Sequence, residues 1–135
     1  MITAIDTSVL LDIFTADKNY GPRSKEALRD CIKKGRIIAC EVVFAEVACA
    51  FPNIKMAKNA LDELGIEFEP FGSQAAMQAG EVFKAYRSLG GKRERVIADF
   101  LIASHALNYA NRLLTRDRGF NRTYFKKLTI IDPSQ

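Results

Sequence analysis

Short apolar runs alternate with segments of helical periodicity along this chain, and that alternation limits its possible folds more than any other feature. The apolar runs predict strands at residues 2–5, 37–39, 66–69, 112–115 and 128–131. Between them, apolar side chains recur at helical spacing in residues 9–14, 24–34, 42–51, 54–64, 73–89, 97–110 and 120–125. Strands that alternate with helices form a mainly parallel sheet covered on both faces. The sequence therefore predicts an α/β fold.

The length and composition indicate one globular domain. The chain has 135 residues, near the commonest size of a domain, and shows no repeat, low-complexity stretch or linker. We therefore expect a single domain over residues 1–135. Hydrophobic residues make up 48% and charged residues 27%, a mixture that excludes a disordered or collagen-like chain.

The sequence predicts a cytoplasmic protein without a membrane partner. No apolar run approaches the roughly 18 residues of a membrane span, and no charged segment precedes the first apolar stretch. The three cysteines have no CxxC spacing, which fits a reducing compartment better than a disulfide framework or a zinc site. The single histidine cannot anchor a His-rich metal site.

Basic residues are concentrated in the second half of the chain. The formal net charge is +4. Residues 1–83 carry nine basic and twelve acidic side chains, whereas residues 84–127 carry eleven basic and three acidic ones. A surface of this kind suits a polyanion such as a nucleic acid, although a solvated basic face would give the same pattern.

Four acidic residues lie where acids are costly. Asp6 and Asp117 follow predicted strands, and Glu46 and Asp99 are embedded in apolar helical segments. A carboxylate in apolar surroundings needs a partner or a raised pKa. Each acid taken alone has a structural explanation: a helix cap, an exposed helix edge, favourable placement near a helix N-terminus, or a surface ion pair.

Taken together, the four acids predict a metal site. Open α/β sheets bind ligands at the carboxyl ends of their strands, where Asp6 and Asp117 project. If Glu46 and Asp99 reach the same crevice, a hard cation such as Mg²⁺ or Mn²⁺ would relieve their repulsion. Such an ion activates water and contacts phosphoryl oxygens. An acidic cluster within a basic surface therefore indicates phosphodiester hydrolysis.

Four segments resemble the motifs of PIN domains, most closely those of VapC-type toxins from prokaryotic toxin–antitoxin modules. They are residues 4–8, 43–47, 98–103 and 113–120, which read AIDTS, VFAEV, ADFLIA and LLTRDRGF. The resemblance covers essentially the whole chain. It implies a three-layer α/β/α fold with a central, mostly parallel sheet of about five strands.

The resemblance also implies an endoribonuclease that depends on Mg²⁺ or Mn²⁺, with one or two ions per site. Its metal-binding and catalytic acids would be Asp6, Glu46, Asp99 and Asp117. Accessory oxygens would come from Thr7, Ser8 and Thr115. The implied substrate is tRNA or ribosomal RNA, so that cleavage inhibits translation. The implied partners are a second copy of the chain and a cognate VapB-type antitoxin that blocks the acidic site.

Arginines flank the last two acids in the sequence. We expect Arg93, Arg95, Arg116 and Arg118 to contact RNA phosphates, whereas Asp12 is expected to face solvent near the first helix. Two other functions remain open at this point. One is a catalytically inert PIN domain that binds RNA as an adaptor, and the other is a metal-dependent nuclease that acts on DNA.

Overall fold

The computed structural model describes residues 1–90 and 96–134, and it has a parallel sheet at its centre. The strands are β1 (Ile2–Ile5), β2 (Arg36–Ala39), β3 (Ile66–Phe68), β4 (Arg112–Leu114) and β5 (Ile130–Ile131), and their order is β3-β2-β1-β4-β5. Every neighbouring pair is parallel. The residues of β1 and β4 are almost all buried, as expected for strands covered on both faces.

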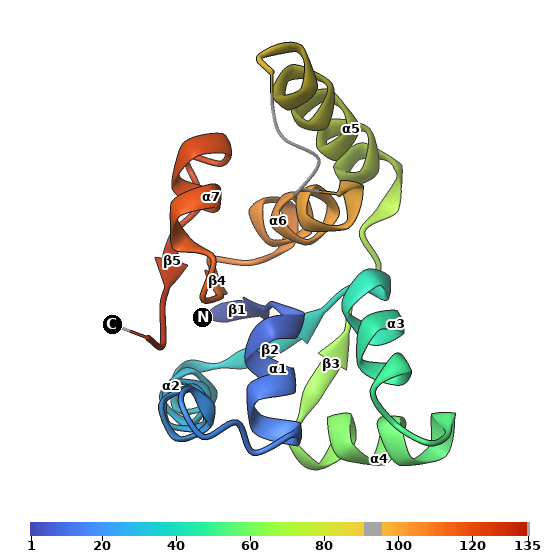
Figure 1. Ribbon diagram of the computed structural model, residues 1–135, viewed down its shortest axis with the longest axis vertical. Coiled ribbons are helices and arrows are strands. Elements are labelled where there is room, and N and C mark those ends of the chain that lie inside the picture. Colours follow the sequence, from blue (N-terminus) through green and yellow to red (C-terminus); the bar gives the residue numbers. More distant parts are fainter. Residues whose placement is uncertain (91–95, 135) are drawn as a thin grey trace.

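The direction of the chain across the sheet decides which face each helix covers. From β1 the chain moves outward to β2 and β3, then returns past β1 to β4 and β5. Because parallel crossovers are right-handed, this reversal sends the later helices to the opposite face. Figure 1 shows this arrangement, with α1 to α4 on one side and α5 to α7 on the other. The predicted three-layer α/β/α fold with five strands is confirmed.

The helices of the first face are α1 (Thr7–Phe14), α2 (Gly21–Lys34), α3 (Glu41–Cys49) and α4 (Ile54–Glu63). Those of the second are α5 (Gly72–Ser88), α6 (Ile97–Tyr109) and α7 (Arg118–Tyr124). None of the described helices is long and apolar enough to cross a membrane.

The helix α6 is buried on most sides and holds the second face together. Phe100 is completely buried and packs edge-on against Phe83 of α5 and Phe120 of α7, with ring centroids 5.0 Å apart in both pairs. The low polarity of residues 97–110 predicted a central helix, and the structure confirms it. This packing fixes the start of α6, where Asp99 lies, relative to the sheet.

Several predicted boundaries differ from the structure by one to three residues, and two of these differences have a clear physical reason. The helix α2 begins at Gly21 instead of residue 24, because Pro22 fits the first turn, where its missing N–H would have no partner anyway. The last strand is shorter than residues 128–131. Its predicted first residue, Leu128, instead donates its N–H to the Phe125 carbonyl at 3.0 Å and closes the turn after α7.

Candidate active site

The carboxyl ends of β1 and β4 carry the centre of the candidate site. These strands pair with Ile5 opposite Leu114, and the Asp6 N–H donates to the Leu114 carbonyl at 3.0 Å. The strand order reverses between β1 and β4: the chain adds β2 and β3 on one side of β1, then β4 and β5 on the other. This edge is therefore the switch point where open α/β sheets bind ligands. Asp117 follows β4 by three residues, so the strand pairing brings it close to Asp6.

Three of the four predicted acids line one small cavity at this edge. They are Asp6 after β1, Asp99 in the first turn of α6, and Asp117 before α7. The cavity has a volume of about 10 Å³, close to the space of one water molecule. Its apolar wall is formed by Ile102, Ala103, Leu113 and Phe120.

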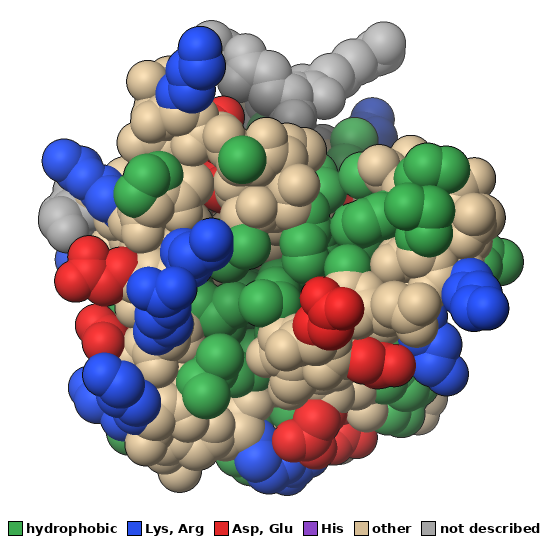
Figure 2. All heavy atoms as spheres, turned by 90° about the horizontal axis from the view of Figure 1, so that it is seen from below, with side chains coloured by type: hydrophobic (Ala, Val, Ile, Leu, Met, Phe, Trp, Pro, Cys, Tyr) green, Lys and Arg blue, Asp and Glu red, His purple; other side chains and the backbone are tan. Residues whose placement is uncertain are grey.

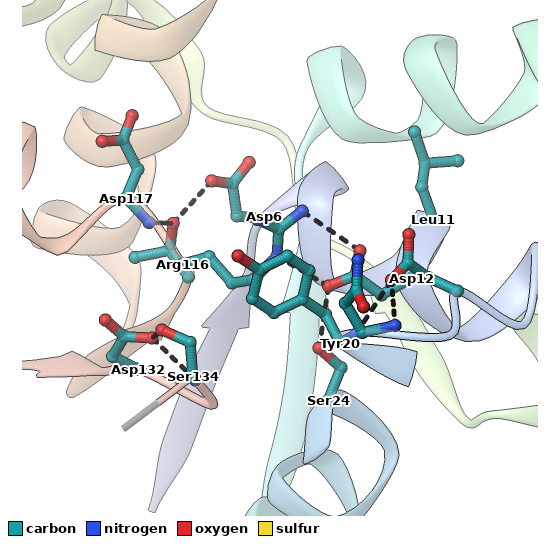
Figure 3. Close-up of polar contacts among 12 residues, drawn as sticks. Asp6, Leu11, Asp12, Tyr20, Ser24, Arg116, Asp117, Asp132 and Ser134 are labelled. Carbon is teal, nitrogen blue, oxygen red and sulfur yellow. Dashed lines mark hydrogen bonds and ion pairs between the residues drawn. The ribbon is translucent and has the colours of Figure 1, made fainter. Parts of the chain in front are cut away.

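The hydroxyl of Thr115 joins two of these acids. Thr115 Oγ1 donates to Asp6 Oδ2 at 2.7 Å and accepts the Asp117 N–H at 3.0 Å. Figure 3 shows these two dashed contacts on either side of the hydroxyl, between the labelled Asp6 and Asp117. Thr115 is completely buried. The residue predicted as an accessory oxygen therefore fixes the positions of both acids.

Burial raises the pKa of Asp6 above its ordinary value of 3.8. The hydrogen bonds from Thr115 and from the Thr7 backbone lower this pKa, whereas the charges of Asp99 and Asp117 raise it further. The net direction is upward, because desolvation is the largest of these effects. The ionised cluster is therefore held at a cost that a cation would offset.

Glu46 lies outside this cavity. It is exposed on α3, and its Oε1 accepts a hydrogen bond from Thr7 Oγ1 at 2.7 Å. Because Thr7 directly follows Asp6, this hydrogen bond connects Glu46 to the residue next to one of the three aspartates. The other predicted accessory oxygen, Ser8 Oγ, is buried and has no hydrogen-bond partner among the described residues.

The donor set of the cavity fits a hydrated Mg²⁺ or Mn²⁺ ion. Among the described residues, no three acidic, histidine or cysteine side chains converge as direct ligands of one ion. Mg²⁺ usually keeps several waters and takes only one or two carboxylates directly. Three carboxylates line a space that would admit one such ion, and the waters it keeps would have to lie outside this space, toward solvent.

Asn121 is a member of the site that the sequence analysis missed. It lies on α7, is only 3% exposed and lines the same cavity as the three aspartates. Its Oδ1 is buried with no hydrogen-bond partner among the described residues. The spacing of four from Asp117 was the available signal, because residues four apart share one face of a helix, but the predicted helical turn began only at residue 120.

An ion pair between the half-buried Arg116 and the buried Asp12 supports the turn that carries Asp117. Arg116 contacts Asp12 of α1 with two hydrogen bonds, Nε to Oδ2 at 2.7 Å and Nη2 to Oδ1 at 3.1 Å. Ser24 Oγ of α2 donates to the same Oδ2 at 2.9 Å, and the guanidinium carbon lies 4.1 Å from the centre of the Tyr20 ring. Figure 3 shows this cluster beside Asp6.

The expectation that Asp12 faces solvent is therefore wrong, since this residue is only 4% exposed. No local pattern in the sequence indicates a partner 104 residues away. The pKa of Arg116 is raised, mainly by its hydrogen bond to Asp12. Arg116 thus joins α1 and α2 to the β4–α7 turn, a role additional to the predicted contact with RNA.

The other predicted RNA-contacting arginines divide into two groups. Arg118 Nε lies 3.9 Å from Asp132 Oδ2, with 31% of its side chain exposed. Its guanidinium is therefore loosely paired and accessible at the edge of the site. Arg93 and Arg95 lie outside the described residues.

The ion pair of Arg116 generates a stability prediction. Arg116→Met should lower the free energy of unfolding by about 3–5 kcal/mol, because the Asp12 carboxylate stays buried without its charged partner. Adding Asp12→Asn to this variant should recover part of the loss. Urea denaturation measures both changes. The matched control is Arg36→Met, which breaks an exposed pair with Glu67 and should cost at most about 1 kcal/mol. Equal losses in the two single variants would contradict the structural role of Arg116.

The raised pKa of Asp6 generates a pH prediction for the metal-free chain. The folded chain keeps a proton on Asp6 that the unfolded chain releases near pH 3.8. Its contribution to stability is therefore present at low pH and is lost as the pH rises through the folded pKa. Asp6→Asn has no such loss. Its free energy of unfolding and melting temperature should therefore exceed those of the parent chain by an amount that grows as the pH rises from 3.8 through the folded pKa of Asp6 and persists at higher pH.

Urea denaturation in EDTA at a series of pH values measures this difference. Asp30→Asn, at an exposed position on α2, is the control and should follow the parent chain throughout. A stability of Asp6→Asn below that of the parent at neutral pH would show that Asp6 is a structural partner instead.

Comparisons with known proteins agree with this geometry. Three similar solved structures are VapBC2 from Rickettsia felis bound to a promoter DNA fragment, VapBC-1 from nontypeable Haemophilus influenzae, and a toxin–antitoxin complex from Klebsiella pneumoniae. Their matched chains are 21%, 17% and 17% identical, with TM-scores of 0.74, 0.75 and 0.66. The match covers 98%, 100% and 97% of this chain and the same shares of those chains.

At these identities the similarity establishes the fold. No curated protein sequence matches the chain significantly. The family comparison, however, matches the PIN domain over residues 3–126, a span that contains Asp6, Glu46, Asp99 and Asp117. The chain belongs to the PIN domain family.

Proposed function

We propose that this chain is an endoribonuclease that depends on Mg²⁺ or Mn²⁺ and serves as the toxin of a VapBC-type toxin–antitoxin module. The observation that carries the proposal is the cavity lined by Asp6, Asp99 and Asp117 at the switch point of the sheet. The charges of Asp99 and Asp117 raise the pKa of Asp6, and a cation would relieve this repulsion. Membership of the PIN domain family also supports a cation site.

Each residue has a distinct part in the proposed reaction. When bound, the cation supplies a Lewis acid that makes a water molecule more acidic and stabilises the charge on a phosphodiester. Asp6, Asp99 and Asp117 would hold the cation. Thr115 holds Asp6 and Asp117 next to each other through its two hydrogen bonds. Glu46, whose Oε1 accepts a hydrogen bond from Thr7 Oγ1 at 2.7 Å, would contribute a fourth carboxylate through a cation-bound water.

The basic second half of the chain supports a polyanionic substrate. Arg118 is partly exposed beside Asp117 and is the described arginine best placed to contact a phosphate. Arg93 and Arg95 precede Asp99 in the sequence, and we retain them as proposed RNA contacts. Arg116 would act chiefly by holding the turn, since Asp12 occupies two of its donors.

An apolar face supports a protein partner. Figure 2 shows hydrophobic side chains gathered in a hollow on the face formed by α1 to α4, with basic and acidic side chains around it. The helices α2 and α4 of this face carry the exposed hydrophobic residues Ile32, Ile54 and Met56. The similar structures are complexes, two of them VapBC and one named as toxin–antitoxin. We propose that a VapB-type antitoxin covers this face.

We also propose that the chain forms a homodimer and acts in the cytoplasm, where cleavage of tRNA or ribosomal RNA would stop translation. A monomeric mass in multi-angle light scattering would contradict the dimer. Sequencing of RNA ends after induced expression would identify the RNA that is cut.

A cleavage assay tests the proposed activity. Purified chain is incubated with total RNA, single-stranded DNA and duplex DNA, each with Mg²⁺, with Mn²⁺ or with EDTA. We expect cleavage of RNA only, and only with a cation. Asp99→Asn should reduce the rate by roughly 100-fold or more, since loss of even an outer-shell partner costs about 10–100-fold. Asp30→Asn is the matched control and should cleave like the parent chain.

Each other outcome identifies a different function. Cleavage that survives EDTA or Asp99→Asn would contradict the metal-dependent mechanism. Preferential cleavage of DNA would support the alternative DNA-directed nuclease. Binding of RNA without cleavage under every condition would support the inert adaptor. Thermal denaturation confirms that Asp99→Asn is folded, because removing one charge from the cluster should not lower the metal-free melting temperature.

A further inference from the structure

In the side-chain amide of Asn121, the nitrogen has a hydrogen-bond partner, whereas the oxygen has none among the described residues. Asn121 Nδ2 donates to the Asp117 carbonyl at 2.8 Å, across one turn of α7. Its Oδ1 is buried and has no hydrogen-bond partner among the described residues. Because the Asp117 carbonyl can only accept, this bond fixes which end of the amide is nitrogen. The unpartnered atom is therefore an oxygen.

The surroundings of Asn121 limit what can satisfy that oxygen. The residue is 97% buried in the wall of the cavity that also contains Asp6, Asp99 and Asp117. The other lining residues are the apolar Ile102, Ala103, Leu113 and Phe120, whose side chains offer no donor. Ionised carboxylates are acceptors only, so they offer none either. A buried acceptor without a partner costs free energy, so a bound species should supply the contact.

A hydrated divalent cation meets that requirement and also suits the three carboxylates. Its waters donate hydrogen bonds, and the ion itself accepts neutral amide oxygens as ligands. We propose that Asn121, through its Oδ1, is a fourth oxygen contact of the hydrated cation in this cavity. The inference rests on the metal-dependent function proposed above, and it adds a neutral ligand to a set otherwise made of carboxylates.

A titration with Mn²⁺ in the absence of RNA tests this role. Asn121→Leu removes the oxygen with little change of volume, and we expect the dissociation constant measured by calorimetry to rise by about 10-fold or more. Asn121→Asp loses the bond to the Asp117 carbonyl but keeps an oxygen at the same place. Its affinity should equal or exceed that of the parent chain, because a further carboxylate attracts the cation.

The matched control is Asn108→Leu. Asn108 Nδ2 donates to the Ser104 carbonyl at 2.8 Å, the same four-residue geometry, but it is exposed on α6 away from the cavity. This variant should bind Mn²⁺ like the parent, whatever its melting temperature. The control separates the loss of an amide bond on a helix from the loss of an oxygen in the cavity.

The outcomes distinguish this inference from the function on which it rests. If the parent chain binds Mn²⁺ and Asn121→Leu binds it equally well, the role of Asn121 is overturned and the metal site stands. Weaker binding by Asn121→Asp would likewise overturn it, since the nitrogen would then be the important atom. If Asn121→Leu does not fold, Asn121→Ala, which also lacks the oxygen, takes its place, with the same expected loss of affinity. If the parent chain does not bind Mn²⁺, the proposed metal-dependent function fails together with this inference.

Discussion

The parallel pairing of β1 with β4 is the constraint on which the candidate site depends. It places Ile5 opposite Leu114, so that the residues after both strands leave the same edge of the sheet. Thr115 then donates to Asp6 and accepts from the Asp117 backbone. Two acids more than 100 residues apart in sequence are thereby fixed by one hydroxyl. Asp99 joins them because the aromatic packing of Phe100 fixes the start of α6 above these strands.

Two neighbouring charged residues of the β4–α7 turn, Arg116 and Asp117, have opposite surroundings. The Arg116 guanidinium is paired with Asp12 in a geometry that uses both carboxylate oxygens, and Ser24 adds a third hydrogen bond. A half-buried charge paired with a buried carboxylate through several hydrogen bonds rigidifies the segment that carries it. Asp117, next along the chain, instead lies with two other acids beside a cavity. A rigid paired residue therefore supports a repulsive cluster, which is the arrangement expected where a cation is bound after folding.

The sequence predicted the fold and most of the candidate site, because both depend on local patterns. Apolar runs and helical periodicity are properties of neighbouring residues, and the five strands and seven helices followed from them. Acids in apolar surroundings are also visible locally, and Asp6, Asp99 and Asp117 share a cavity as predicted. The boundary of the last strand was wrong because a turn after α7 takes Leu128 out of the predicted strand.

The parts that could not be predicted depend on contacts between distant residues. Asp12 looks like an exposed helical acid until Arg116, 104 residues later, is placed against it. Glu46 has the sequence surroundings of a core acid, yet α3 turns it to the surface beside Thr7. Asn121 is a polar residue in a short helix, and only the position of α7 over the sheet reveals that its side-chain oxygen is buried with no hydrogen-bond partner in the described part of the chain. Burial and partnership of this kind are tertiary properties.

The central claim is that Asp6, Asp99 and Asp117 form a divalent cation site, and the location of a bound ion tests it most directly. Crystals of the chain grown with Mn²⁺ would be measured for anomalous scattering. The account predicts a Mn²⁺ peak in the cavity at the ends of β1 and β4, in contact with at least one of the three aspartates directly and with the others directly or through water. An empty cavity in crystals at saturating Mn²⁺, or a peak only elsewhere on the chain, would contradict it.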